Sequence, residues 1–410
     1  MIKTLLPLSS LFLSFIFLCL ANGLQNTLIG VRATLENFPD WVVGFMMSIY
    51  FVGFLAGAII TPYIINRVGQ IRTFAAFASL FSSTSLLHIL MVDPFGWIIF
   101  RFLHGFSMAT LIVVIESWLN ASSNGKNRGK VLSVYMIINF LCLSLSQLFM
   151  LFSDPMQFTL FALVSVLASL SLMPLLLSRM QQPSIEIMEH ISLHSLIRIS
   201  PLATFGTFIT GVCSGAFWGM SAVYFTKIGM IPANIAWFIS LSFLGGLLFQ
   251  WPIGYLSDYF NRRVAIVLCS LVSAISTLLI LFFAEFEPQE RIHYLLPLGI
   301  LFGGFYYPLY SLAISLANDF LKPEQFIKAS SKLLFLHAIG AIIGPMLAAS
   351  CMMIMGDSGL FVLLTFLFTS LLAFAALRIA SGRAIPEETT GSFVQMPRTI
   401  TSSVLLEQTH

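Results

Sequence analysis

One arginine, Arg101, lies inside a long apolar run, in the segment Arg101-Phe-Leu-His104-Gly105. If this run crosses a membrane, the charge is costly in lipid and should face a partner or a water-filled cavity. Its positive charge disfavours a cationic solute. The alternative is a snorkelling side chain, since Arg101 would lie about 10 Å from the outer end of its helix at roughly 1.5 Å per residue.

Other polar side chains are scattered through the apolar runs, where carriers place their solute-binding groups. Asn22 and Asn26 are one helical turn apart and share a face. Hydrogen bonds between neighbouring helices are the alternative explanation for each of these residues. With Arg101, the predicted substrate-binding residues are Asn22, Gln25, Asn26, Asn139, Trp218, Gln250, Tyr306, Tyr307 and His337, and Tyr310 is a further candidate for the cavity wall.

No aspartate or glutamate falls near the middle of an apolar run. A carrier of organic cations usually needs such a group, so we expect a neutral, zwitterionic or anionic solute. Histidine can take up a proton near neutral pH, which makes His104 and His337 candidates for proton coupling. Glu116 is a third candidate, although it lies close to one end of its run.

A short loop pattern, Gly254-Tyr-Leu-Ser-Asp258-Tyr-Phe-Asn261-Arg262-Arg263, lies between two apolar runs. A carboxylate at such a loop can cap a helix N-terminus, and the arginines can pair with a carboxylate on a neighbouring helix. We expect Arg262 to pair with Asp319. The alternative is a set of charges that only fixes the orientation of the chain.

A second, weaker copy of the pattern follows an earlier run, in Pro62-Tyr-Ile-Ile-Asn66-Arg67-Val-Gly69. It keeps Arg67 and Gly69 but has Asn66 where the other copy has an aspartate. Glu116 is the expected partner of Arg67 or Arg72. The predicted cytoplasmic gate therefore comprises Asn66, Arg67, Gly69, Glu116, Asp258, Arg262, Arg263 and Asp319.

The composition requires a bilayer around these residues. The 410 residues are 58% hydrophobic and 9% charged, whereas soluble domains are roughly a quarter charged. A spanning helix needs roughly 20 apolar residues. Because lipid offers no hydrogen-bond partners to backbone N–H and C=O groups, the spans must be helical. We predict an all-α membrane protein with twelve transmembrane helices at 5–29, 42–64, 73–92, 95–118, 131–152, 158–178, 201–225, 235–256, 264–284, 293–315, 330–350 and 357–378. The first is expected to be an uncleaved span rather than a signal peptide.

The loop charges fix the orientation. With the N-terminus inside, sixteen of the twenty lysines and arginines are cytoplasmic; only Arg32, Lys227 and Arg291 lie outside, and Arg101 lies within a span. This bias predicts that both termini are cytoplasmic. The predicted domains are an N-terminal six-helix bundle (1–178), a cytoplasmic linker (179–200), a C-terminal six-helix bundle (201–380) and a polar cytoplasmic tail (381–410) that we expect to be disordered. An amphipathic linker helix is expected from Ile185, Met188, Ile191, Leu193 and Leu196.

The two bundles show weak internal similarity. An offset of about 192 residues places Asn22-Gly23 on Ser214-Gly215 and Gly53 on Gly245. An offset of about 199 places Gly105 on Gly304 further along. Such a repeat predicts two pseudo-symmetric bundles related by an axis along the membrane normal, as in many transporters.

The loop around Asp258, Arg262 and Arg263 resembles the GxxxDRxGRR signature of the major facilitator superfamily, and Arg101 to Gly105 looks like its fourth-helix RxxxG element. The segments Val31 to Gly44, Ile115 to Asn120 and Tyr135 to Asn139 are similar to the YcaD-type branch. The resemblance implies the major facilitator fold and a bacterial inner-membrane carrier with multiple spans. It also implies secondary active transport by alternating access, as a symporter or antiporter that we expect to be proton-coupled.

Other classes of protein are disfavoured. No GxSxG, HExxH, P-loop or strand-borne GxGxxG occurs, and the five cysteines have no CxxC spacing, so we expect no catalytic residue, metal or cofactor. Nothing resembles a channel filter, and no basic face points to nucleic acid. We expect a monomer whose partners are lipid, a small solute and protons.

Two alternatives remain open: a multidrug efflux proton antiporter and a non-transporting receptor or scaffold. The first is weakened because span five has no GPxxG element of the kind found in antiporters. Gly340 and Gly344 of span eleven resemble that element in part, but small residues four apart are expected to serve helix packing.

Overall fold

The computed structural model describes residues 8–122, 128–177, 193–259, 261–321 and 325–381. Contacts divide these residues into two compact units, one over 8–177 and the other over 193–381. The helices of the first unit are α2 (Ser9–Leu35), α3 (Asp40–Val68), α4 (Gln70–Leu90), α5 (Pro94–Ala121), α6 (Arg128–Leu148), the 3-10 turn η2 (Phe149–Leu151), α7 (Thr159–Leu170) and α8 (Leu172–Leu176).

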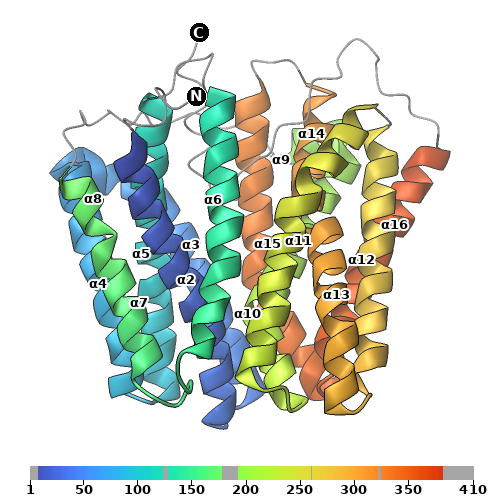
Figure 1. Ribbon diagram of the computed structural model, residues 1–410. Coiled ribbons are helices and arrows are strands. Elements are labelled where there is room, and N and C mark those ends of the chain that lie inside the picture. The colour runs from blue at the N-terminus through green and yellow to red at the C-terminus, as the bar shows by residue number, and fades with distance from the viewer. Residues whose placement is uncertain (1–7, 123–127, 178–192, 260, 322–324, 382–410) are drawn as a thin grey trace. The chain divides into compact units, whose positions relative to one another are not determined.

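The second unit begins with a short helix and continues with long ones (Figure 1). Its helices are α9 (Leu193–Ile199), α10 (Pro201–Lys227), α11 (Pro232–Tyr259), α12 (Arg262–Ala284), α13 (Pro288–Tyr306), α14 (Pro308–Asn318), α15 (Phe326–Met355) and α16 (Gly359–Ala380). Within the described residues of both units, twelve segments are helical, long and apolar enough to cross a bilayer, which confirms the predicted number.

The first span continues past its predicted end at Ile29 to Leu35, although it contains Arg32. The guanidinium of this arginine finds hydrogen-bond partners while its backbone stays helical. Its guanidinium lies 2.6 Å from Glu36 Oε1, one turn further along, and donates to the backbone carbonyls of Pro155 and Met156. Because those carbonyls belong to the connection between η2 and α7, Arg32 fastens the end of α2 to that connection.

The tenth span, predicted as one helix over 293–315, is longer and interrupted. The helix α13 ends at Tyr306, and α14 begins at Pro308. Proline has no amide hydrogen to continue the helical ladder, which explains the break at this point. The sixth span is also divided, with α7 and α8 separated by Ser171.

Close backbone contacts confirm the internal repeat and correct one of its offsets. A Cβ atom on Gly53 would lie 2.2 Å from the Phe102 carbonyl oxygen, and one on Gly245 would lie 2.1 Å from that of Ile300. The two contacts are equivalent: the glycines are 192 residues apart, and their carbonyl partners are 198 residues apart. The predicted offset of about 199 is therefore one residue too long.

The partner of Gly105 is accordingly Gly303 rather than Gly304. A Cβ on Gly105 would lie 2.0 Å from the Tyr50 carbonyl oxygen, and one on Gly303 would lie 1.8 Å from that of Ser242. Tyr50 and Ser242 are themselves related by 192 residues. Thus α3 packs on α5 in the first unit as α11 packs on α13 in the second.

The glycines of span eleven pack against α10. A Cβ on Gly340 would lie 2.6 Å from the Phe208 carbonyl oxygen, and one on Gly344 would lie 2.3 Å from that of Val212. This confirms the packing interpretation of these two residues, because no side chain would fit between the helices.

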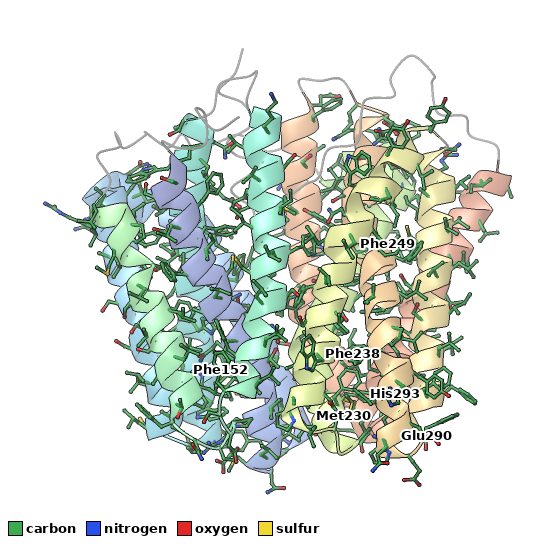
Figure 2. All side chains as sticks on the ribbon, in the orientation of Figure 1. Phe152, Met230, Phe238, Phe249, Glu290 and His293 are labelled. Atoms are coloured by element: carbon green, nitrogen blue, oxygen red, sulfur yellow. The ribbon has the colours of Figure 1, made fainter. Side chains whose placement is uncertain are left out.

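Apolar side chains cover the outside of the helices and polar ones lie within, the reverse of a soluble protein. Phe152, labelled in the lower part of the first unit in Figure 2, is 70% exposed. Leu90, Phe95 and Ile354 are also strongly exposed, whereas Asn26, Arg101 and His104 are buried. This arrangement suits a lipid environment, in which exposed apolar surface carries no cost.

Part of the predicted linker helix is present as α9. Its Leu196 is buried and packs with Leu321, Ala329 and Phe326. The positions of Ile185, Met188 and Ile191 lie outside the described residues, as does the predicted disordered tail from residue 382 onward.

We expect Gly105→Ala to destabilise the protein by about 1–3 kcal/mol, because the new methyl group would overpack the contact between α3 and α5. Thermal unfolding of the purified protein in detergent measures this effect. Gly206→Ala is the matched control, since its Cβ would meet the nearest atoms at 3.5 Å, an ordinary contact distance. Equal unfolding temperatures for the two variants would contradict the packing described here.

Candidate functional site

A polar cluster in the first unit surrounds Arg101. One guanidinium nitrogen, Nη2, donates to Asn26 Oδ1 (2.8 Å) and lies 3.5 Å from Met47 Sδ. The other, Nη1, lies 3.0 Å from His104 Nδ1. The arginine is 1% exposed, so the snorkelling alternative does not describe its position.

An aromatic ring completes the surroundings of the guanidinium. Arg101 Cζ lies 4.4 Å from the ring centroid of Tyr50, a cation–π contact. The Tyr50 hydroxyl donates to Asn22 Oδ1 (3.0 Å), which also lies 3.5 Å from Asn26 Nδ2. We call Asn22, Asn26, Tyr50, Arg101 and His104 the Arg101 cluster. It is assembled from α2, α3 and α5.

The cluster lacks a negative charge. Among the described residues, no aspartate or glutamate forms an ion pair with Arg101. Burial of a cation with only neutral partners is costly, and such residues in membrane proteins commonly mark solute or ion pathways. The described residues also contain no group of three or more metal-ligating side chains that could hold an ion.

The remaining amides of α2 and α6 contact other partners. Gln25 accepts a hydrogen bond from Ser85 (2.9 Å), and Thr27 donates to Gln147 (2.5 Å). Asn139 is half-buried and lies 3.6 Å from Cys19 Sγ. For Gln25 and Asn139, the geometry therefore matches the alternative of bonds between helices.

In the second unit, the predicted binding residues form separate groups. His337 lies with its ring 4.5 Å from that of Tyr310, and its Nδ1 lies 3.5 Å from Thr210 Oγ1. The ring of Phe243 contacts both Trp218 (5.4 Å) and Tyr307 (5.5 Å).

The last two predicted residues of this unit are also buried. Tyr306 stacks on Phe302, with ring centroids 5.3 Å apart. Gln250 Nε2 lies 3.4 Å from Ser311 Oγ. The second unit therefore presents mainly aromatic rings and neutral polar groups at its predicted binding positions.

Glu116 does not make the predicted ion pair. Its Oε1 accepts a hydrogen bond from the Tyr135 hydroxyl (2.8 Å), and the side chain is buried. Arg67 and Arg72 are exposed, and neither pairs with Glu116 within the described part of the chain. The predicted partners were wrong, since Oε1 of this carboxylate contacts Tyr135 of α6 and neither of these two arginines pairs with it.

The loop of the second unit forms the expected contact. Arg262 Nε lies 3.0 Å from Asp319 Oδ2, and Arg262 Nη2 lies 3.2 Å from Asp258 Oδ1. The Arg262 side chain is 4% exposed and that of Asp319 is 2% exposed, whereas that of Asp258 is 32% exposed. Arg263 is also buried, and its Nη1 lies 3.4 Å from the Arg378 carbonyl oxygen. This loop is thus tied to α14 and α16.

The loop of the first unit has fewer described contacts. Asn66 is exposed like Arg67, and Gly69 ends α3 with a φ of 85°. That positive φ favours glycine and lets α4 begin at the next residue. Gln70, the first residue of α4, accepts a hydrogen bond from Ser117 of α5 (3.2 Å).

Sequence reasoning missed three residues that contact the predicted site or its neighbours: Tyr50, Tyr135 and Gln147. Tyr50 and Tyr135 are rings in apolar runs, where a tyrosine is expected to serve packing unless its hydroxyl partner is known. Gln147 is a plainly polar residue in a span, and it could have been found by the rule that placed Gln25 among the candidates.

Comparisons with known proteins agree with this architecture. The family model described as Major Facilitator Superfamily matches residues 11–198 and 203–404. A protein of Escherichia fergusonii, described as the uncharacterized MFS-type transporter YcaD, is 28% identical over 360 residues, which cover 87% of this chain and 92% of that protein. The protein of the same description from Escherichia coli K12 is 27% identical over the same shares.

Solved structures share the fold at low sequence identity. A point mutant of the nucleoside transporter NupG superposes with a TM-score of 0.73 at 13% identity, covering 91% of this chain and 99% of that one. A D-xylose-proton symporter superposes with a TM-score of 0.70 at 14% identity, covering 94% and 99%. These values confirm the predicted fold class.

We expect Asp319→Asn to destabilise the protein more than Asp258→Asn. Loss of one partner of a buried ion pair costs about 3–5 kcal/mol, whereas a partly exposed pair contributes about 1 kcal/mol or less. The unfolding midpoints of both variants in detergent measure the difference. A larger effect of Asp258→Asn would show that the exposed carboxylate is the principal partner of Arg262.

Proposed function

This chain belongs to the Major Facilitator Superfamily, and we propose that it carries a small solute across the bacterial inner membrane by alternating access, coupled to protons. It is a multi-pass membrane transporter with twelve apolar helices within its described residues. The proposed inner-membrane location follows from its bacterial relatives, and cytoplasmic termini follow from the positive charges of its loops.

The Arg101 cluster is the observation that carries this proposal. Carriers concentrate polar groups inside the bundle at membrane depth, where the solute replaces water. Arg101 is buried there beside the amide of Asn26 and the ring of Tyr50, with no carboxylate paired to it among the described residues. This chemistry favours a neutral, zwitterionic or anionic solute, because a cation would meet a like charge.

The solute-binding residues that we propose in the first unit are Asn22, Asn26 and Arg101, with Gln25 and Asn139 as supporting residues between helices. Those in the second unit are Trp218, Gln250, Tyr306, Tyr307 and His337. His104, His337 and Glu116 remain the proposed proton-binding groups. A D-xylose-proton symporter among the structures with this fold supports coupling to protons.

We further propose that the buried contacts near the cytoplasmic loops hold one conformation of the carrier. Arg262 bridges α11 and α14 through Asp258 and Asp319. Glu116 and Tyr135 connect α5 with α6. Contacts of this kind can break and re-form as helices shift, which gives a gate its two states.

Uptake by proteoliposomes is the direct test. We expect accumulation of at least one member of a panel of sugars, nucleosides, amino acids and carboxylates, increased by an imposed pH gradient. Arg101→Gln should lower that uptake about tenfold or more, because it removes a charge-assisted contact. Arg198→Gln, at an exposed position of α9, is the control. If no solute accumulates in wild-type vesicles, or the Arg101 variant is fully active, the proposal fails.

Drug efflux predicts a different phenotype. In a bacterial strain without its efflux pumps, we expect expression of this protein to leave the sensitivity to cationic dyes unchanged within about twofold, because Arg101 repels cations. Growth inhibition by ethidium and a second cationic dye measures this. Strong resistance to both dyes would favour a multidrug antiporter.

A further inference from the structure

The contact between Arg101 and His104 fixes the protonation state of the histidine. A guanidinium carries only hydrogen-bond donors, so His104 Nδ1, at 3.0 Å from Arg101 Nη1, must accept. The proton of a neutral His104 then resides on Nε2. The cluster thus holds one positive charge on Arg101 and a neutral imidazole beside it.

Protonation of His104 is incompatible with this arrangement. A second proton would occupy Nδ1, where Arg101 donates, and would place two cations about 3 Å apart. The histidine is fully buried, with its ring stacked on Phe81 at 4.5 Å, so water cannot screen the repulsion. His104 can therefore take up a proton only when a negative charge balances the pair or when Arg101 moves away.

The other groups around His104 supply no negative charge. From α3 the Tyr50 ring lies 5.1 Å away, and from α4 the titratable side chain is His88, whose Nδ1 lies 2.6 Å from the Thr84 carbonyl oxygen. From α2 the cluster receives the neutral amides of Asn22 and Asn26. The missing anion must therefore come from outside the described residues.

Each of the two side chains has a buried nitrogen without a partner among the described residues. Arg101 Nε and His104 Nε2 both lack a hydrogen bond. Buried polar atoms are normally paired, and each unpaired one implies a cost or a ligand. Because both nitrogens are donors, the group that complements them is an acceptor, and an anionic oxygen is the best acceptor for a guanidinium.

We infer that the solute is an organic monocarboxylate and that it enters with one proton, held on His104. The carboxylate binds Arg101 and draws its Nη1 from His104 Nδ1, which then accepts the proton. This inference rests on the proposed function and names its substrate class and its coupling group. It assigns the coupling to His104 rather than to His337 or Glu116.

One proton for each singly charged carboxylate keeps the charge of the cluster constant. The empty cluster carries one positive charge; the carboxylate cancels it, and the proton on His104 restores it. The loaded and empty carriers therefore have the same charge, and transport is electroneutral. A dianion that enters with one proton would instead change the charge of the cluster from one to zero, and an imposed potential would then affect its uptake.

Matched solutes test the substrate class. Proteoliposomes with an internal pH of about 7.5 and an external pH of about 6, a range in which histidine can change charge, are given gluconate or gluconamide, and hippurate or hippuramide. We expect uptake of at least one carboxylate and about tenfold less of its amide. A potential imposed with potassium and valinomycin should not change the uptake, and protein-free liposomes correct for passive entry.

Variants test the residue roles. Arg101→Gln should weaken carboxylate binding about tenfold or more, measured as the concentration that raises the unfolding temperature in detergent. His104→Gln keeps an acceptor for Arg101 but cannot take a proton. It should therefore retain exchange of labelled for unlabelled carboxylate and lose accumulation driven by the pH gradient. His293→Gln, at an exposed position of α13, is the control (Figure 2).

Several outcomes would overturn the inference. Uptake of amides but not carboxylates would do so while leaving the proposed transport intact, as would potential-driven uptake. Loss of gradient-driven accumulation in His337→Gln but not in His104→Gln would move the coupling to the other unit. If no carboxylate is bound or taken up, the inference is wrong. If the broader solute panel fails as well, the proposed function is wrong with it.

Discussion

Lipid offers no hydrogen-bond partners, so polar groups within a span depend on the protein or a ligand for theirs. The backbone meets this demand as helices, and glycines such as Gly105 and Gly303 allow those helices to touch. Polar side chains meet it by pointing inward. Even the arginines outside the predicted cytoplasmic set follow the rule: Arg291 Nη1 donates to the Ile228 carbonyl oxygen (2.7 Å), as Arg32 donates to that of Pro155.

Among the described arginines, the two most buried meet this demand differently. Arg262 has carboxylates at 3.0 and 3.2 Å, so its charge is balanced within the second unit. Arg101 is held by an amide oxygen, an imidazole nitrogen and an aromatic face, which orient the guanidinium but do not neutralise it. A balanced ion pair stabilises one conformation, whereas an unbalanced charge is suited to bind an ion that comes and goes.

The number of spans could be predicted from the sequence, because each span is a continuous apolar run. The Arg262–Asp319 contact could also be predicted, because Arg262 belongs to a recognisable loop pattern. The partner of Glu116 could not. Whether a carboxylate near a helix end faces a loop arginine or the Tyr135 hydroxyl depends on the rotation of α5, which apolar periodicity does not define when all faces are apolar. The extension of α2 past Arg32 was missed for a similar reason, since its carbonyl partners lie more than a hundred residues away.

The corrected repeat shows how the halves of one fold acquired different chemistry. With offsets of 192 and 198 residues, the counterparts of Asn26, Arg101 and His104 are Trp218, Gly299 and Phe302. The backbone contact of Gly105 with Tyr50 is preserved as that of Gly303 with Ser242, while the charged group, the histidine and the amide are replaced. The helix packing is therefore common to both units, but the charge proposed to select a solute and the imidazole proposed to couple it belong to the first alone. Because the two groups lie one helical turn apart on α5, a rigid movement of that helix carries both together, and the proposed solute must compete for their 3.0 Å contact.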